Sequence, residues 1–452
     1  MKLIFGYDIM TYNGPLPNCL DPKFISTIYE GSKFDYCKSH NYFNEKWGVD
    51  YCVFNSGDYN RIAIKKSVYD IVIDRENRNS YKWFYIIEPH SSLDQFFGFH
   101  KTHNEFGMNF ISEQAINEIK NYNGYLLFNY TIDGGLGITK TNFELIKNFT
   151  RGHQIPDEKV YFIFGDYKLK ENLKNLGVNY LVHDYNFYLF FKSHEFNNII
   201  IGRDKRSTVQ SKEDYVSNIK NDKKDFLLLA RHWKQHRIFL LNKIHRLNLE
   251  NSLVSWESTY YNQKMIDLVK EHDDNPVFFD MLKTSRYVDV DDLVSVWGYG
   301  AENKEIYINT YLSIVTESIF FQEDDSFPSG YISEKIWKPI GHCQPFILAG
   351  PSNSLKYLRD RYGFKTFHPY IDESYDEIED EIERIKAIEN EMEKFSNKTK
   401  EEKIKFLEDV KDICFYNLDL FLSFDKKNTS DLSVNVELKK VYDFLTYSSK
   451  YI

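Results

Sequence analysis

The feature that most constrains the fold is an alternation of short apolar runs with amphipathic stretches. In the first part of the chain, helix-like segments at 112–121, 141–149 and 168–176 separate runs that each have the length of one strand. Strands and helices in regular succession are typical of a mostly parallel sheet covered by helices. The sequence therefore predicts an α/β fold. The strands expected in this part are 3–7, 51–55, 71–74, 84–87, 125–129, 160–165 and 180–182.

A polar stretch separates this series from a second one. Residues 202–224 read GRDKRSTVQSKEDYVSNIKNDKK, a composition that is typical of a linker or of a surface segment between domains. Apolar strand-like runs then resume at 226–230, 253–256, 306–316 and 345–349, followed at 378–395 by apolar residues with helical spacing.

These patterns predict two similar α/β units. We expect an N-terminal domain at 1–205, a linker at 206–224 and a second domain at 225–425. The remainder, 426–452, is expected to contain a C-terminal helix that could pack back on the first domain. Open α/β sheets bind ligands beyond the carboxyl ends of their strands, so the loops that follow strands are the places to look for a site.

Composition narrows the function classes. The 452 residues include 57 basic and 67 acidic side chains, and the net charge of −10 argues against a nucleic-acid coat or a membrane-surface binder, although a local basic groove stays open. The five cysteines form no CxxC pair, which indicates neither a zinc ribbon nor a disulfide framework. No apolar run approaches the ~18 residues of a membrane span, and the first run is too short for a signal peptide. We therefore expect a cytoplasmic protein with no membrane partner.

The first candidate segment is FLLLARHWKQHRIFLLNKIHR at 226–246. A strand is followed by a loop and by a helix expected from about Gln235, and Arg231 and Arg237 fall in the loop and in the first helical turn. A helix N-terminus attracts anions, and a guanidinium group matches the oxygens of a phosphate. The segment therefore favours a phosphate site, with a solvated basic loop as the alternative.

The second segment is SGYISEKIWKPIGHCQPFILAG at 329–350. Ser333 is a good N-cap, which places Glu334 and Lys335 in the first turn of a helix. Lys335 is unfavourable there unless it contacts a phosphate, and Glu334 could accept hydrogen bonds from a ribose. Pro339 would free the Lys335 carbonyl, so the helix should be short or kinked. The alternative is an exposed helix start without a ligand.

The third segment is INTYLSIVTESIF at 308–320, a strand that ends in Thr316–Glu317–Ser318. A carboxylate at the end of a strand, facing a cleft, could bind sugar hydroxyls. The alternative is an ordinary polar strand end.

Together the last two segments resemble the donor-binding signature of α1,3-fucosyltransferases. That signature is a strand ending in Glu-Asn-Ser, then Tyr-x-Thr-Glu-Lys, a helix and a Pro-led strand. The spacing between its two parts is longer here. The matching positions are Glu317, Ser318 in place of Asn, Tyr331, Ser333 in place of Thr, Glu334 and Lys335.

The resemblance implies roles for these positions. In that family the Glu-Lys pair binds the ribose and the diphosphate of a nucleotide sugar. An arginine in the helix after the first strand of the second domain helps to hold the diphosphate, and Arg237 falls there; Arg231 is a candidate helper. Glycosyltransferase-like proteins of phages and giant viruses are similar over about 110–395, including GFKTFHPYIDESYDEI. This similarity implies the GT-B architecture, two Rossmann-like domains facing across a cleft, and the host cytoplasm if the protein is viral.

The implied reaction is metal-independent transfer of a hexosyl, pentosyl or fucosyl group from a nucleoside diphosphate sugar, with no cofactor besides that donor. An inverting reaction needs a base for the acceptor hydroxyl, and we expect it in the first domain. Asp133 in LLFNYTIDGGLG is the preferred candidate and Glu88 in FYIIEPHSS is the second. Either residue could instead serve a turn or a cap.

Other functions stay open at this point. Asp289 and Asp291, or the acidic run 323–325, could bind a divalent metal in a GT-A-type transferase. The chain could also be a non-catalytic carbohydrate- or nucleotide-binding protein, because a fold does not fix a function. The acceptor could be a glycan, a protein or a modified phage DNA base, which would have to be extruded from its stack. The oligomeric state is equally open.

Overall fold

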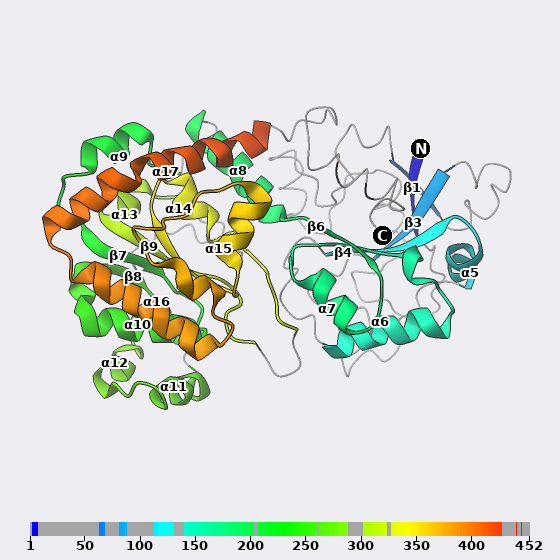
Figure 1. Ribbon diagram of the computed structural model, residues 1–452, viewed down its shortest axis with the longest axis horizontal. Helices are drawn as coiled ribbons and strands as arrows, with labels where there is room; N and C mark the ends of the chain where they lie inside the picture. Colours follow the sequence, from blue (N-terminus) through cyan, green and yellow to red (C-terminus); the bar gives the residue numbers. More distant parts are fainter. Residues whose placement is uncertain are drawn as a thin grey trace. The chain divides into compact units, whose positions relative to one another are not determined.

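The computed structural model (Figure 1) divides the chain into two compact units. The N-terminal unit comprises Met1–Phe187, Asp324–Ser329 and Lys426–Ile452, and the C-terminal unit comprises Tyr188–Glu323 and Gly330–Asp425. The residues that the structure describes are 2–7, 63–67, 81–87, 113–130, 140–202, 207–260, 262–287, 302–322, 327–426, 440 and 444.

The N-terminal unit is built on a sheet of six parallel strands. The strands are β1 (Lys2–Tyr7), β2 (Ala63–Ser67), β3 (Tyr81–Ile87), β4 (Gly124–Tyr130), β5 (Val160–Phe164) and β6 (Leu181–Asp184). Their order in the sheet is β2-β1-β3-β4-β5-β6, and every neighbouring pair runs parallel. The described helices between the strands are α5 (Glu113–Asn121), α6 (Lys140–Gly152) and α7 (Leu169–Asn175).

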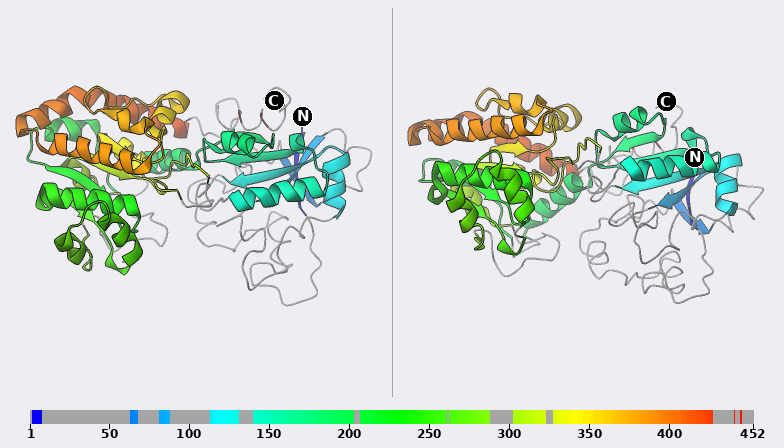
Figure 2. Two further views of the ribbon diagram at one scale, coloured as in Figure 1. Left: turned by 60° about the horizontal axis from the view of Figure 1, so that its bottom comes forward. Right: turned by 90° about the horizontal axis from the view of Figure 1, so that it is seen from below.

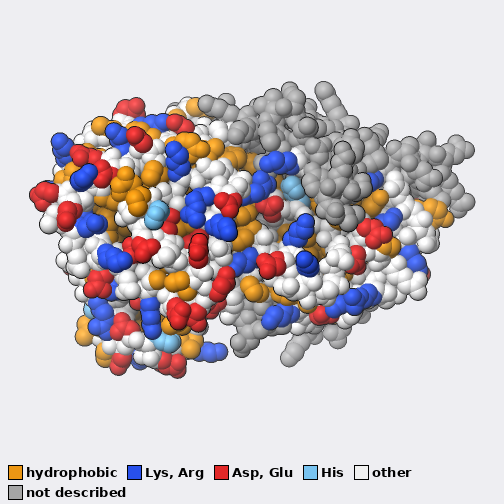
Figure 3. Space-filling model, in the orientation of Figure 1, with side chains coloured by type: hydrophobic (Ala, Val, Ile, Leu, Met, Phe, Trp, Pro, Cys, Tyr) orange, Lys and Arg blue, Asp and Glu red, His pale blue; other side chains and the backbone are white. Residues whose placement is uncertain are grey.

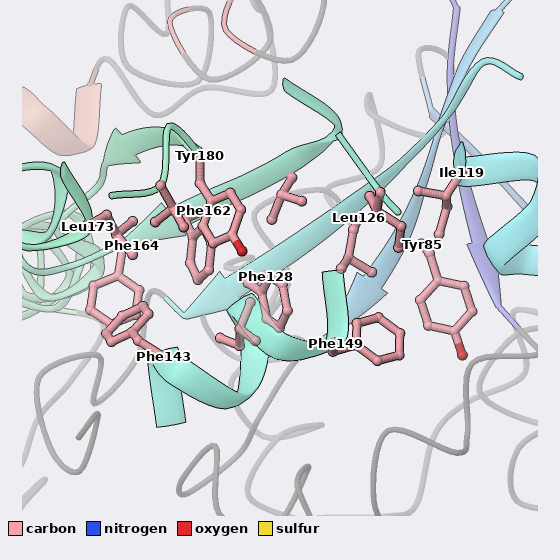
Figure 4. Packing of buried hydrophobic residues seen from close by; sticks show 14 of the residues in the cluster. Tyr85, Ile119, Leu126, Phe128, Phe143, Phe149, Phe162, Phe164, Leu173 and Tyr180 are labelled. Atoms are coloured by element: carbon pink, nitrogen blue, oxygen red, sulfur yellow. The ribbon is translucent and has the colours of Figure 1, made fainter. Parts of the chain in front are cut away.

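The core of this unit lies between these helices and one face of the sheet. Phe143 and Phe149 of α6 pack toward Phe128 of β4 and Phe162 of β5 (Figure 4). The rings of Phe128 and Phe162 are stacked, with their centroids 4.7 Å apart. All five residues of β5 are buried, as expected for a parallel strand that is covered on both faces.

The C-terminal unit contains a second parallel sheet. Its strands are β7 (Lys224–Leu229), β8 (Ser252–Ser255), β9 (Thr310–Thr316) and β10 (Phe346–Ala349), in the order β10-β9-β7-β8. Helices lie along both faces of this sheet (Figure 2). The described helices of this unit are α8 (Phe187–Ile200), α9 (Lys212–Asn218), α10 (Gln235–Asn248), α11 (Gln263–Lys270), α12 (Pro276–Met281), α13 (Lys304–Ile308), α14 (Trp337–Gly341), α15 (Ser354–Tyr357), α16 (Glu381–Ser396) and α17 (Lys400–Lys426).

The predicted α/β class with parallel sheets is confirmed. Most expected strands match observed ones to within a few residues, but the expected strands at 51–55 and 71–74 lie outside the described residues. One expected strand, 306–316, was wrong at its start. Residues there form helix α13, because the Asn303 side chain accepts the backbone N–H of Glu305 and so caps a helical turn before β9.

The polar stretch after the first series is not only a linker. It contains helix α9, which begins with a capping box formed by Ser211 and Asp214. Tyr215 on this helix is buried, and its hydroxyl donates a hydrogen bond to the Leu407 carbonyl in α17. A single buried aromatic residue therefore anchors a helix whose other residues are polar except for the exposed Val216, and the apolar pattern of the sequence could not indicate it.

Part of the C-terminal segment belongs to the N-terminal unit. Phe444 is buried, and its ring centroid lies 5.3 Å from those of Tyr161 on β5 and His183 on β6. Among the helices of the described residues, none combines the length and the apolar character that a membrane crossing requires.

Candidate anion-binding site

The candidate site lies at the carboxyl ends of β7 and β9 in the C-terminal unit. The chain runs from β7 to β8 on one side of β7, and β9 then lies on the other side. The order of the strands therefore reverses between β7 and β9, and such a reversal opens a crevice where α/β sheets bind ligands. The segments that follow these two strands carry the basic and acidic residues singled out in the sequence.

Hydrogen bonds join the start of α10 to the end of β9. The Arg237 guanidinium donates from Nη2 to the Thr316 carbonyl at 3.4 Å. His236 Nε2 lies 3.0 Å from the Glu317 carbonyl oxygen, so this nitrogen carries the proton. Burial, followed by the nearby Arg237 charge, lowers the pKa of His236 well below its usual value, and the ring stacks on Phe320. His236 is a neutral structural anchor, a role that its position in a basic loop did not reveal.

Glu317 is fully buried at the centre of the site. Its Oε2 accepts hydrogen bonds from the backbone N–H of Ser318 at 3.3 Å, from the N–H of Ser333 at 3.0 Å and from the Ser333 hydroxyl. Its Oε1 is buried and has no hydrogen-bond partner among the described residues. Burial raises the pKa of Glu317, while Lys335 and the Ser333 hydrogen bonds oppose the rise. A carboxylate oxygen in this position can accept a hydrogen bond from a hydroxyl group of a ligand.

Gly350, just after β10, leaves the space that the buried Glu317 side chain occupies. A Cβ at this position would stand 3.2 Å from Glu317 Cγ and 3.3 Å from Ser354 Oγ, which is tighter than an ordinary contact. The glycine therefore lets the end of β10 approach the Glu317 side chain. The sequence offered one signal for it, the glycine at the end of the Pro-led strand.

Lys335 presents the second cationic group. Its ammonium donates to Glu334 Oε1 at 2.8 Å, Ser318 Oγ at 3.0 Å and Ser333 Oγ at 3.1 Å. The side chain is 25% exposed, so the ammonium is oriented and still reachable from solvent. Burial raises the pKa of Glu334, but the attraction of Lys335 outweighs it and brings that pKa to about 2. The Glu334 carboxylate is therefore charged at neutral pH.

Arg237 is the most unusual residue of the site. It is 5% exposed. Among the described residues its guanidinium donates only to backbone carbonyls, to His232 O at 2.7 Å and to Thr316 O at 3.4 Å, and its Nε has no acceptor there. No carboxylate among the described residues forms an ion pair with it. Burial lowers the pKa of Arg237 to about 10, although the charges of Glu334 and Glu317 oppose the shift. A buried cation without a counterion is unfavourable, and an anionic ligand would relieve it.

Two further predicted residues have other surroundings. The Arg231 guanidinium lies over the Tyr287 ring, 5.8 Å from its centroid. Tyr331 is 2% exposed, and its ring meets the Tyr188 ring edge to face, with the centroids 6.4 Å apart. Tyr331 is therefore a core residue beneath the site.

The helix predicted to start after Ser333 begins later. Ser333 does not cap it, and α14 starts at Trp337 with Ile336 at its N-cap. The reason is Pro339, which has no N–H for the Lys335 carbonyl; that carbonyl accepts from Lys338 N–H at 3.4 Å instead. Glu334 and Lys335 thus lie in a turn, and α14 is too short to contribute a strong dipole. The longer α10, whose N-terminus no side chain caps, is the helix that can contribute one.

The predicted catalytic bases are not tested. Asp133 and Glu88 lie outside the described residues, as do Asp289, Asp291 and the acidic run 323–325. In the part of the chain that the structure describes, no group of three or more His, Cys, Asp or Glu side chains could hold a metal ion.

No protein-family model matches the chain, and no curated protein matches it. The resemblance to α1,3-fucosyltransferases therefore stays a prediction from the motif residues.

Replacing Glu317 with glutamine should change how stability depends on pH. The pKa of Glu317 is raised above its ordinary 4.5, so the folded protein holds this proton at pH values where the unfolded chain has lost it. Its contribution to stability is present below pH 4.5 and is lost as the pH rises through the folded-state pKa. Urea titrations give the free energy of unfolding of the variant minus that of wild type, and we expect this difference to increase as the pH rises from 4 to 7. A difference that decreases over this interval would contradict the raised pKa.

Replacing Gly341 with alanine should destabilise α14. A Cβ at Gly341 would overlap the ring of Phe196, which is fully buried. Overpacking of this kind costs about 1–3 kcal/mol, so we expect Gly341→Ala to lower the free energy of unfolding by that amount. Gly152→Ala is the matched control, because nothing lies within 4 Å of its Cβ position and it should be neutral or stabilising by about 0.5 kcal/mol. Equal effects of the two variants in urea unfolding would refute the packing argument.

Proposed function

We propose that the protein is a glycosyltransferase that moves a sugar from a nucleoside diphosphate sugar to an acceptor hydroxyl, without a metal ion. The observation that carries the proposal is the buried Arg237 guanidinium, which has no carboxylate partner in the described part of the chain. The carboxylates of Glu317 and Glu334 interact electrostatically with this guanidinium. The Lys335 ammonium donates a hydrogen bond to Glu334. A ligand that combines a diphosphate with sugar hydroxyls would complement these groups.

The cations have a definite task in such a reaction. The bond between the anomeric carbon and the β-phosphate oxygen breaks, and the leaving nucleoside diphosphate gains negative charge on that oxygen. Arg237, Lys335 and the N-terminus of α10 would stabilise this charge, which is the kind of interaction that lowers a barrier most. The acceptor oxygen forms the new glycosidic bond, and its proton passes to a base, for which Asp133 and Glu88 stay the candidates.

The carboxylates would bind the neutral parts of the donor. Glu317 Oε1 is buried without a hydrogen-bond partner in the described part of the chain, and the Glu334 carboxylate is charged at neutral pH. In the ionised form each carboxyl group is an acceptor only, so both suit the hydroxyl groups of a ribose or of the transferred sugar. The two parallel α/β units and the reversal of strand order at this site support a GT-B architecture, which remains part of the proposal.

The distribution of charge on the surface helps to choose between the possible classes of acceptor. On the face of the molecule in Figure 3, the described acidic and basic side chains are interspersed, and the net charge of the chain is −10. Nucleic-acid binding depends on clustered positive charge that neutralises phosphates. We therefore propose a glycan or a protein as the acceptor in preference to a DNA base.

A thermal-shift panel of nucleotide sugars in excess EDTA tests the proposal. A ligand present at 100 times its Kd stabilises the folded state by about 2.7 kcal/mol. We expect sugars of one nucleoside diphosphate, and the free diphosphate itself, to raise the unfolding temperature, and the active sugar to be hydrolysed or transferred. A panel without any shift would refute the proposed function. A shift without turnover across many glycan and protein acceptors would leave a non-catalytic nucleotide-sugar-binding protein.

A further inference from the structure

A second group of charged side chains is buried in the same unit. Lys192 on α8 is fully buried, with its Nζ 2.6 Å from Glu195 Oε2 and 3.3 Å from Glu302 Oε1. Glu302, just before α13, also lies 3.5 Å from Lys338 Nζ and 3.4 Å from His342 Nε2. We call these five residues the Glu302 cluster. The function proposed above uses none of them.

The Glu302 carboxylate holds α14 at both ends. Lys338 lies in α14 and His342 is its C-cap, and each contacts a different oxygen of Glu302. The His342 ring is itself fixed, because it stacks on Tyr307 with centroids 3.8 Å apart and its Nδ1 accepts the backbone N–H of Gln210 at 3.2 Å. Its Nε2 therefore carries the proton and donates to Glu302.

The backbone of Glu302 is itself held in place by two hydrogen bonds. Its N–H donates to the Ser207 hydroxyl at 3.1 Å, and its carbonyl accepts the Thr208 N–H at 2.7 Å. The side chain is therefore a rigid point of attachment between the polar stretch, α8 and α14.

Helix α14 depends on such an attachment. It has only five residues, one of which is Pro339, and a helix of this length gains little from its own hydrogen bonds. The turn that carries Glu334 and Lys335 leads directly into it. The position of the Lys335 ammonium therefore depends on what holds α14 in place.

Charged groups of the cluster also interact electrostatically with Glu334 in the anion-binding site. The carboxyl of Glu334 has its low pKa chiefly through Lys335, which outweighs burial, and Lys338 contributes to the same shift. Burial lowers the pKa of Lys192, but Glu195 and Glu302 outweigh it and raise the pKa, and Glu334 adds to the rise. Buried ion pairs add little net stability compared with apolar packing, and fixing one arrangement is their best-supported use.

We propose that Glu302 is a positioning residue for the anion-binding site: by holding Lys338 and His342 it fixes α14 and the turn that presents Lys335 to the ligand. This inference rests on the proposed function, since it names what keeps that site in its binding geometry. Glu302 itself does not touch the ligand.

Binding of inorganic pyrophosphate, measured by calorimetry in EDTA, tests the inference with a matched pair of variants. Glu302→Gln and Glu195→Gln each remove one carboxylate from Lys192, but only Glu302 contacts α14. We expect Glu302→Gln to weaken pyrophosphate binding about tenfold and Glu195→Gln to change it less than twofold, although both lower stability. Equal weakening by the two variants, or none by Glu302→Gln, would overturn the inference.

A double-mutant cycle with Lys335→Met separates positioning from a general loss of stability. If Glu302 acts through Lys335, the loss of affinity on Lys335→Met should be several-fold smaller in the Glu302→Gln background than in wild type. Additive effects would show that Glu302 acts elsewhere. If Glu302→Gln does not fold, Lys338→Met and His342→Phe carry the test, because each removes one of the two contacts to α14, and each should weaken binding.

Hydrogen exchange in the absence of ligand distinguishes the two proposals. We expect Glu302→Gln, and not Glu195→Gln, to speed amide exchange in 333–342 at least tenfold. Faster exchange in a protein that fails to bind pyrophosphate would contradict the proposed function and, with it, the role of Glu302 in binding. If the wild-type protein binds pyrophosphate but Glu302→Gln does not change the exchange rate, the role of Glu302 is refuted and the proposed function is not.

Discussion

Replacing Lys335 with methionine is expected to lower sugar transfer by a factor on the order of 10²–10³, because one cation that stabilises the leaving diphosphate is lost. Methionine keeps the unbranched stem, while the hydrogen bonds to Glu334, Ser318 and Ser333 disappear. The affinity for the free nucleoside diphosphate should fall as well. Initial rates of transfer and calorimetric binding measure the two effects.

A second lysine provides the control for this variant. Lys283 follows α12 and pairs with Asp280 at 2.9 Å, but its side chain is 61% exposed and lies outside the site. Lys283→Met removes the same charge from a solvated position, where an ion pair contributes little. It should leave transfer unchanged. Retention of full activity by Lys335→Met would contradict the assignment of Lys335 to the diphosphate.

Replacing Arg237 with methionine should separate stability from function. The buried guanidinium has no ion-pair partner in the described part of the chain, and its Nε has no acceptor, so removing it relieves an unfavourable charge. We expect the free energy of unfolding of the unliganded protein to stay level or to rise by about 1 kcal/mol. Transfer should fall by a factor on the order of 10²–10³, and stabilisation by a nucleoside diphosphate should be lost. Urea unfolding with and without the diphosphate measures both.

Arg384 on α16 is the matched control for Arg237. It is equally buried, but its guanidinium donates to the carbonyls of Ile378, Glu379 and Phe320 and lies 4.5 Å from the centroid of the Phe320 ring. Arg384→Met should therefore destabilise the protein by about 2 kcal/mol and leave the stabilisation by ligand intact. A loss of 3 kcal/mol or more in unliganded Arg237→Met would mean that Arg237 is a structural residue like Arg384.

The parallel α/β architecture could be predicted because strands buried on both faces are short, continuous apolar runs. Strand β5 is such a run, and the sequence placed it within one residue of its observed end. Prediction failed where apolar residues continue through a change of structure, as at α13, where Asn309 alone separates a helical turn from β9.

For the site, the structure brings the three predicted segments together, but the sequence did not indicate their internal geometry. Glu317, Ser318, Ser333 and Lys335 are joined by hydrogen bonds in the structure, whereas their role in binding a donor stays a prediction. The Glu302 cluster was missed, because Glu302 is far in the chain both from Lys192 and Glu195 and from Lys338 and His342. One signal was present: Lys192 stands among aromatic residues in FYLFFKSHEFNNII, where a charged side chain is expected to be buried with a partner.

The most direct test of the central claim is a crystal structure with the nucleoside diphosphate that raises the unfolding temperature most. We predict that diphosphate oxygens lie within hydrogen-bond distance of Arg237 Nε and Lys335 Nζ, with a ligand hydroxyl on Glu317 Oε1. A diphosphate bound elsewhere, with Arg237 and Lys335 keeping only their present contacts, would contradict the account.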